Sequence, residues 1–155
     1  VSAEELPEGV SKFLGCAYHV INDLEQIGDH AVKLLEQTEE NIERGKPYSR
    51  TAQEELTEIY QSDIKLLQAT MEIFLNRHVE PENWMLLRKK ERKILKTASM
   101  AQSNHMDRLK KNECTFEQGL TFVEALNSYI RIVNHTINMA EASASDILVG
   151  MVKAE

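Results

Sequence analysis

Long helical periodicity, broken at only three places, is the feature that most constrains the fold of this chain. In the first segment, from about Val10 to Arg44, the apolar positions alternate in steps of three and four. This is the spacing of an apolar seam along one face of a helix. The seam positions are Val10, Leu14, Ala17, Ile21, Leu24, Gly28, Ala31, Leu35, Thr38 and Ile42. The chain has only six glycines and three prolines among 155 residues, about half the usual density, which argues against a fold of many short strands.

The breaks carry residues that end and begin helices. Gly45 follows the first segment, as glycine commonly follows a helix C-terminus. Ser49 has the position of an N-cap, and Pro81 that of a first helical residue, where proline loses no hydrogen bond. Thr115 with Gln118 resembles a capping box. The predicted helices therefore cover about 10–44, 49–79, 81–111 and 115–155.

Short connections between long helices determine the expected architecture. They force neighbouring helices to run antiparallel, and a helix of about 30 to 35 residues is roughly 45–50 Å long. The sequence therefore predicts a single all-α domain, an elongated antiparallel up-down bundle of four long helices. The other apolar seams are predicted at Leu56, Tyr60, Leu67 and Phe74, at Leu87, Ile94, Ala98 and Leu109, and at Leu120, Val123, Ile130, Val133, Ile137, Ala140 and Ala144.

Charge and cysteine content exclude several classes of protein. The formal net charge of −7 argues against a dedicated nucleic-acid binder, which is usually basic. No apolar run approaches the roughly 18 residues that span a bilayer, so we expect a soluble fragment. Cys16 and Cys114 fall at opposite ends of the predicted bundle and cannot form a disulfide. A reducing, cytoplasmic environment is the expected one.

Catalytic motifs are scarce. The sequence has no glycine-rich phosphate loop, no nucleophile elbow and no H-E-x-x-H. None of the five histidines has a glutamate three residues before it, so the Glu-x-x-His of di-iron bundle enzymes is missing. We therefore predict that the chain is not an enzyme.

One dense cluster of acidic residues on the first helix suggests a metal site. Glu25 and Asp29 are one helical turn apart, so both carboxylates project from the same flank. Counting residues from the turn places Asp63 of the second helix level with Asp29. Three carboxylates could hold a divalent Mg, Mn or Fe ion. The alternative is that Glu25 and Asp29 are solvated carboxylates beside a close helix contact at Gly28.

Three polar residues, Asp63, Glu91 and His105, interrupt apolar seams. A buried carboxylate must be paired, protonated or bound to a metal. Turn counting places Glu91 level with Asn134 and His135, and His105 far from both levels. These positions are candidate sites, and the alternative is that they are hydrogen-bonded buried polar groups.

The third helix is basic within an acidic chain. It has nine Lys and Arg against three Asp and Glu, whereas the first helix has three against seven. A solvated face is one interpretation. The other is a docking surface for an acidic partner or an anionic membrane.

Two motifs resemble a known family. The stretch 22–31 closely resembles the D-L-E-R-I-G-D-H-A signature of the PhoU family, with Gln26 at the usual arginine. Its signature residues here are Asp23, Glu25, Gly28, Asp29 and His30. His105 and Arg108 resemble the H-x-x-R-L segment of the PhoU-like cytoplasmic tail in bacterial sodium/phosphate symporters, and Tyr48-Ser49 resembles its F-S.

The resemblance implies an internal repeat. PhoU proteins contain two three-helix bundles with the signature on the last helix of each. Residues 10–44 would then be the last helix of one repeat and 49–155 a complete second repeat. The two signature copies lie 105 residues apart, with Asn134 at the position of Asp29. The second copy has lost its acidic residues, and of the signature residues 23–31 only Ile132 and His135 persist.

The resemblance also implies a function. It predicts a non-catalytic regulatory domain of a sodium-dependent phosphate symporter, on the cytoplasmic side of the cell membrane. The expected partner is the transmembrane domain of that transporter, or another membrane transporter, and a homo-oligomer is left open. The alternatives are a stand-alone PhoU-type regulator of phosphate uptake, a metal-dependent enzyme using Glu25 and Asp29, and a purely structural oligomerisation bundle.

Overall fold

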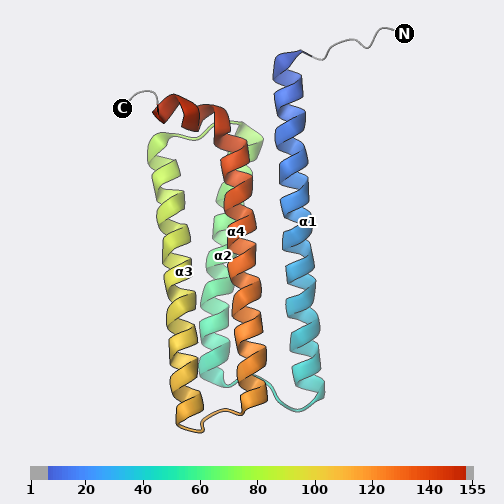
Figure 1. The fold of residues 1–155 in the computed structure, drawn as a ribbon, viewed down its shortest axis with the longest axis vertical. Coiled ribbons are helices and arrows are strands. Elements are labelled where there is room, and N and C mark those ends of the chain that lie inside the picture. The colour runs from blue at the N-terminus through green and yellow to red at the C-terminus, as the bar shows by residue number, and fades with distance from the viewer. Residues whose placement is uncertain (1–6, 153–155) are drawn as a thin grey trace, which may run out of the picture.

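The computed structural model describes residues 7–152 and contains an elongated bundle of four helices (Figure 1). Helices that follow one another in the chain run antiparallel, because short segments join them. The predicted all-α class is confirmed. The helices are α1 (Glu8–Glu43), α2 (Arg50–Asn76), α3 (Pro81–Lys110) and α4 (Phe116–Val152).

The predicted helix boundaries have the expected local chemistry. The Ser49 hydroxyl accepts a hydrogen bond from the Ala52 N–H at 3.2 Å, as an N-cap does. At the start of α4, the Gln118 N–H donates to the Thr115 hydroxyl, and the Thr115 N–H donates to the Gln118 side chain. Gly45 has a φ of +67°, the left-handed conformation that glycine adopts at no steric cost. Capping is decided within a few residues, which is why the sequence predicted it.

Helix α4 is central to the bundle (Figure 1). It packs against α1, α2 and α3, and α2 and α3 also pack against each other. The main core between α2, α3 and α4 includes the buried side chains of Ile59, Leu66, Phe122 and Val133. Among the described residues, the backbone of α1 lies close to no helix except α4.

A smaller apolar cluster attaches α1 to the bundle. Val20 and Ile27 of α1 pack with Ile132 and Met139 of α4. Phe74 of α2 also contacts this cluster. Helix α1 is therefore held along one side only.

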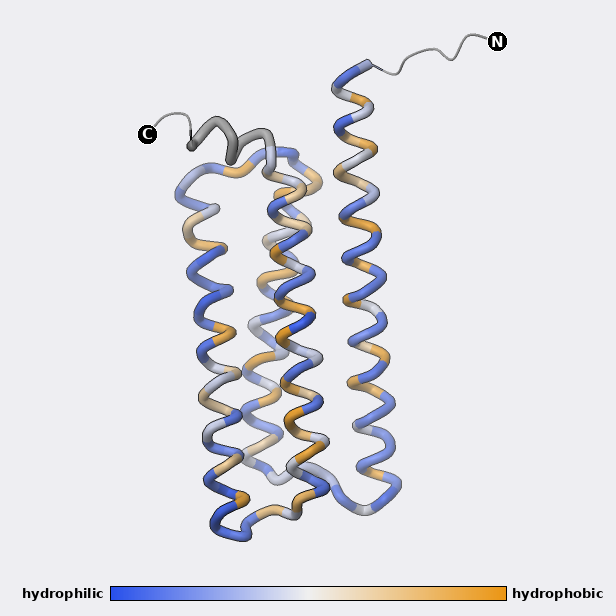
Figure 2. The backbone as a smooth tube through the Cα atoms, in the orientation of Figure 1, coloured by the Kyte–Doolittle hydropathy of each residue, from blue (hydrophilic) through white to orange (hydrophobic). Residues whose placement is uncertain are grey.

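The predicted seam of α1 is not in the core. Leu14 is 50% exposed, Ile21 62%, Leu35 59% and Ile42 63%. Val20 and Ile27 each precede a seam position by one residue, so they point about 100° away from it. Helix α1 thus has two apolar stripes, and the bundle uses the one that the three-four pattern did not identify. Figure 2 shows hydrophobic residues recurring along the whole of α1.

The other predicted seams are mostly correct. Leu56, Leu87, Ile94, Val133 and Ile137 are buried as expected. The predicted burial of Tyr60 and Leu120 was wrong, because both side chains are about half exposed. Ile59 and Phe122 are buried instead. Within residues 7–152, no helix is long and apolar enough to cross a membrane.

Candidate functional site

The acidic signature on α1 is divided between two faces of the helix. Asp23 and His30 are partly buried and point toward α4, whereas Glu25, Gly28 and Asp29 are exposed. This division follows from the 100° rotation per residue of a helix. The signature therefore does not form a single pocket.

A hydrogen bond joins Asp23, on the partly buried side of the signature, to α4. The His135 Nδ1 lies 2.8 Å from Oδ1 of Asp23, and the two side chains are 23% and 17% exposed. A carboxylate accepts, so the imidazole Nδ1–H donates. This contact joins residues 112 positions apart in the chain.

His30 stacks on the same imidazole. The two ring centroids are 6.0 Å apart, with planes inclined by 28°. Burial lowers the pKa of His30 below its usual value, and the positive charges of His135, Arg131 and Lys33 lower it further. Asp29 opposes this shift. The lowered pKa favours a neutral His30 at physiological pH.

The two copies of the signature meet across the α1–α4 interface. Ile27 and Ile132 occupy equivalent positions and share one apolar cluster. His30 and His135 are also equivalent, and their rings stack. Within the signature residues 23–31, these are the two positions at which both copies carry the same residue. Because α1 and α4 run antiparallel, the copies are related by a local two-fold arrangement.

The exposed signature residues, Glu25, Gly28 and Asp29, face open space. A Cβ added to Gly28 would meet nothing within 4 Å. The close helix contact predicted at Gly28 is therefore not formed within the described chain. Glu25 and Asp29 are both exposed beside this position.

Asp63 lies elsewhere, inside the bundle. The residue is 4% exposed, and neither carboxylate oxygen has a hydrogen-bond partner among the described residues. Burial raises the pKa of Asp63 to about 8. Burial also raises the pKa of Tyr129 on α4 to about 12, and the charge of Asp63 adds to that shift.

The predicted three-carboxylate metal site is therefore wrong. Asp63 is buried on α2, while Glu25 and Asp29 are exposed on α1. Turn counting gives the height of a residue along the bundle and not the direction of its side chain. Within residues 7–152, no three His, Cys, Asp or Glu side chains are grouped to hold a metal ion. These residues do not fit a Mg, Mn or Fe site.

The second motif, His105 and Arg108, lies in a packed cluster near the C-terminal end of α3. His105 is 2% exposed and its ring lies 4.8 Å from that of Phe122. Arg108 binds both carboxylate oxygens of Glu55, at 3.2 and 2.7 Å. Burial lowers the pKa of His105, and the Arg108 charge lowers it further. A Cβ at Gly119 would come within 2.7 Å of the His105 Nε2. The arrangement stabilises the junction of α2, α3 and α4.

The remaining predicted positions are accounted for by ordinary contacts. Glu91 faces Arg88 on the same helix, with Nε and Oε2 3.2 Å apart. Arg88 also binds Glu141 of α4 at 3.0 Å. Asn134 is exposed. Both cysteines, Cys16 and Cys114, are free, as expected.

The basic character of α3 is concentrated in one exposed stretch. Its exposed members are Lys89, Lys90, Arg92, Lys93 and Lys96. Helix α3 has no close backbone contact with α1 among the described residues, and the two helices lie at opposite edges of the bundle (Figure 1). The molecule thus has a basic edge and an acidic edge.

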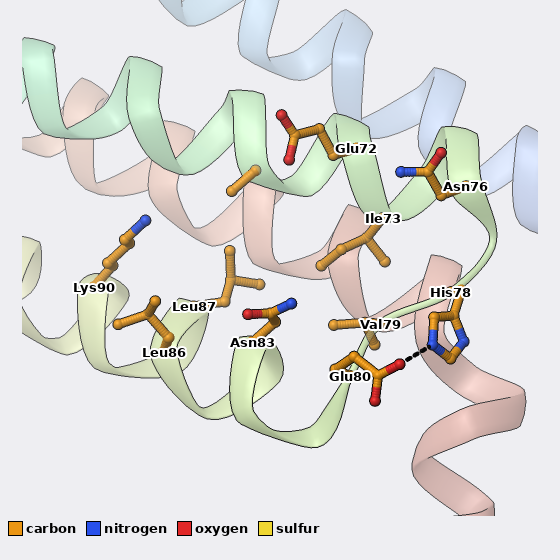
Figure 3. Close-up of a pocket in the computed structure, with 11 residues that line it drawn as sticks. Glu72, Ile73, Asn76, His78, Val79, Glu80, Asn83, Leu86, Leu87 and Lys90 are labelled. Carbon is orange, nitrogen blue, oxygen red and sulfur yellow. Dashed lines mark hydrogen bonds and ion pairs between the residues drawn. The ribbon is translucent and has the colours of Figure 1, made fainter.

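Two of the open grooves on the surface lie away from the predicted site residues. The first, of about 480 Å³, lies between α2 and α3 near their connection, where His78 Nε2 lies 2.7 Å from Glu80 Oε1 (Figure 3). The second, of about 520 Å³, is lined by Tyr48, Tyr60 and Tyr129. No predicted site residue lines either groove. The three tyrosines come from different parts of the chain, so no local sequence signal predicted that they would lie together.

No known protein family, no characterised protein and no solved structure matches the chain significantly. The interpretation of this site therefore depends on its geometry and on the two sequence motifs.

Proposed function

We propose that the chain is a PhoU-like, non-catalytic regulatory domain of a sodium-dependent phosphate symporter, acting on the cytoplasmic side of the cell membrane. The observation that carries this proposal is the meeting of the two signature copies at the α1–α4 interface. It supports the internal repeat that the resemblance implies.

Positions 105 residues apart meet across the α1–α4 interface. Ile27 and Ile132 pack together, and His30 and His135 stack. Each pair is separated by 105 residues. Any antiparallel pair of helices brings some positions 105 residues apart to the same level, so the support comes from the identity of the residues that meet there, Ile with Ile and His with His. The pairing is expected if α1 and α4 are the last helices of two repeats.

The contacts at this interface suggest how a signal would pass through the domain. Asp23 and His30 both contact His135, so a displacement of α1 changes a hydrogen bond and a ring contact on α4. Partner contacts made by the outward Glu25 and Asp29 would act on the same helix. The basic stretch of α3 suits the anionic inner surface of a membrane, which attracts Lys and Arg by about 1 kcal/mol each.

A transport assay tests the proposal. We would measure sodium-dependent phosphate uptake by cells that express the intact parent protein, with Glu25→Ala/Asp29→Ala compared with wild type at equal surface abundance. Both residues are exposed, so the fold should be retained. We expect a changed uptake rate. The matched control is Asp107→Asn, an exposed carboxylate on α3, which should transport like wild type.

Two results would contradict the proposal. Unchanged uptake in the double variant would favour a purely structural bundle. An intact reading frame without membrane-spanning helices before Val1 would exclude a transporter tail and favour a stand-alone regulator of phosphate uptake.

A further inference from the structure

The side of α3 that faces away from the bundle carries a regular stripe of lysine and methionine. Its members recur in steps of three and four residues, so they lie within about 80° of one another around the helix. All of them are exposed, and the two methionines are 63% and 56% exposed. The opposite side of α3, with Leu87 and Ile94, packs in the core. The outer stripe consists of Met85, Lys89, Lys93, Lys96 and Met100.

The lysines of the outer stripe form no ion pair within the part of the chain that the structure describes. The acids beside them are paired with another cation, because Glu91 of α3 and Glu141 of α4 both bind Arg88. Arg92 flanks the outer stripe, is also exposed and forms no ion pair there either. Four positive charges therefore follow one another over about 10 Å of helix.

Acidic residues limit this basic surface at both ends. Glu82 lies one turn before Met85, and Asp107 lies two turns beyond Met100, on the same side of α3. Asp107 pairs with Lys110. The surface without compensating acids therefore extends from Met85 to Met100, about 22 Å along the helix.

The chemistry of this surface matches that of an anionic bilayer. We infer that the outer stripe binds anionic lipid headgroups, with α3 lying flat on the membrane. Each Lys or Arg near such a surface strengthens binding about fivefold. The flexible, apolar methionines at the two ends would enter the boundary between headgroups and acyl chains. The inference names the face that meets the membrane, and it rests on the proposed function for the presence of a membrane beside the domain.

A lipid surface fits the outer stripe better than an acidic protein does. The charges stand on the convex side of a helix at the edge of the bundle (Figure 1). Three of the four are lysines, whose compact charge on a flexible stem suits mobile headgroups, whereas the arginine fork recognises single carboxylates in fixed geometry. An acidic protein would satisfy the charges, but the methionines at both ends require an apolar layer to cover them.

The position of α3 determines how the bundle would lie on the membrane. Helices α1 and α3 form opposite edges of the bundle (Figure 1). Residues 10–44 contain seven acidic and three basic residues. Binding through the outer stripe keeps this acidic helix away from the anionic lipid, where the repulsion is screened by salt. The long axis of the bundle would then run parallel to the membrane.

Vesicle sedimentation tests the binding surface. The 155-residue chain should bind vesicles that contain phosphatidylglycerol but not vesicles of phosphatidylcholine alone, and salt should weaken the binding. Lys93→Gln/Lys96→Gln should bind about 25-fold more weakly, because two charges are lost. Lys33→Gln/Arg131→Gln removes two exposed cations from α1 and α4 and should bind like wild type. Equal binding by the two double variants, or no binding by wild type, would overturn the inference.

Fluorescence tests whether the methionines reach the lipid. The chain has one tryptophan, so a Trp84→Phe background is free of other tryptophan emission. Met100→Trp in this background should emit at shorter wavelength when phosphatidylglycerol vesicles are added. Phe116→Trp, at an 81% exposed position on α4, is the control and should not shift. An unshifted Met100→Trp would overturn the inference.

Two further measurements separate the remaining explanations. A chain that binds polyglutamate but no vesicles would assign the outer stripe to an acidic protein and overturn the lipid inference. Phosphate uptake is measured independently. If uptake by the parent protein responds to Glu25→Ala/Asp29→Ala while the 155-residue chain binds no vesicles, the lipid inference fails and the proposed function stands.

Discussion

His135 on α4 donates a hydrogen bond from Nδ1 to Oδ1 of Asp23 on α1 across 2.8 Å, and both side chains are mostly buried. This partly buried contact helps to fix the rotation of α1 against α4, where Gln37 and Glu124 form a second, exposed hydrogen bond. An apolar cluster alone would tolerate rotation, whereas a hydrogen bond between two directed groups does not. Its position within the signature explains why Asp23 points inward while Glu25 points outward.

Asp23→Ala should lower the free energy of unfolding by about 1–2 kcal/mol, because it leaves a partly buried imidazole without its acceptor. Urea unfolding followed by circular dichroism measures this loss. Asp29→Ala, on the exposed flank of the same helix, is the control and should change stability by less than about 0.5 kcal/mol. Equal losses in the two variants would show that the hydrogen bond adds nothing.

Asp63 makes stability depend on pH. Its pKa is about 8 in the folded chain, against about 3.9 in an unfolded one. Between these values the unfolded state binds fewer protons, so the free energy of unfolding falls as pH rises from about 4 to about 8. Asp63→Asn removes this dependence and should be the more stable protein above pH 8.

Urea midpoints measured across this pH range check the effect of Asp63. The exposed Asp107 provides the control, and Asp107→Asn should follow the wild-type curve. Parallel curves for wild type and Asp63→Asn would mean that Asp63 is not protonated in the folded chain.

The fold could be predicted because its determinants are local. Ser49, Thr115 with Gln118, and Pro81 each act within one turn of a helix end, so they are readable from neighbouring residues. It was harder to predict which face of each helix packs against the rest of the bundle. Helix α1 carries two apolar stripes, and periodicity alone cannot tell which stripe packs inside the chain and which stays exposed.

The candidate site was only partly predictable, for a similar reason. The burial of Asp63 and His105 followed from their places in apolar seams. The Asp23–His135 contact has no local signal, because 112 residues separate the partners. The 105-residue spacing of the two signature copies was the available clue, since the two retained residues, Ile132 and His135, are those that meet their counterparts.

Gly119 and Gly15 should respond to alanine in opposite ways. A Cβ at Gly119 would lie 2.7 Å from the His105 Nε2, and His105 is confined against Phe122. Gly119→Ala should therefore destabilise the chain by about 1–3 kcal/mol. Gly15 has nothing within 4 Å of its Cβ position, so Gly15→Ala should stabilise by up to about 1 kcal/mol through helix propensity.

Thermal unfolding compares the two alanine variants. Adding His105→Ala to Gly119→Ala relieves the contact, so the two losses should not be additive. A Gly119→Ala variant as stable as Gly15→Ala would refute the close packing of α4 on α3 at this level.

The Arg108–Glu55 ion pair should contribute more than the other charge pairs of the bundle. Its two side chains are 12% and 16% exposed, and two N–H groups of Arg108 bind both oxygens of Glu55. Arg108→Met removes the cation from the partly buried Glu55 carboxylate and leaves only the Asn104 amide donating to it, which should cost about 1–3 kcal/mol. Arg108→Lys keeps the charge but loses the forked geometry, so it should recover only part of the loss.

Arg50 provides the matched control, because it pairs with Glu54 at 2.9 Å while the two side chains are 93% and 63% exposed. Arg50→Met should cost less than about 0.5 kcal/mol, as exposed helix pairs usually do. A double-mutant cycle with Glu55→Gln isolates the coupling, because removing both partners leaves no unpaired charge. The double variant should lose less stability than the two single losses combined, and a loss in Arg108→Met no larger than in Arg50→Met would contradict the assignment.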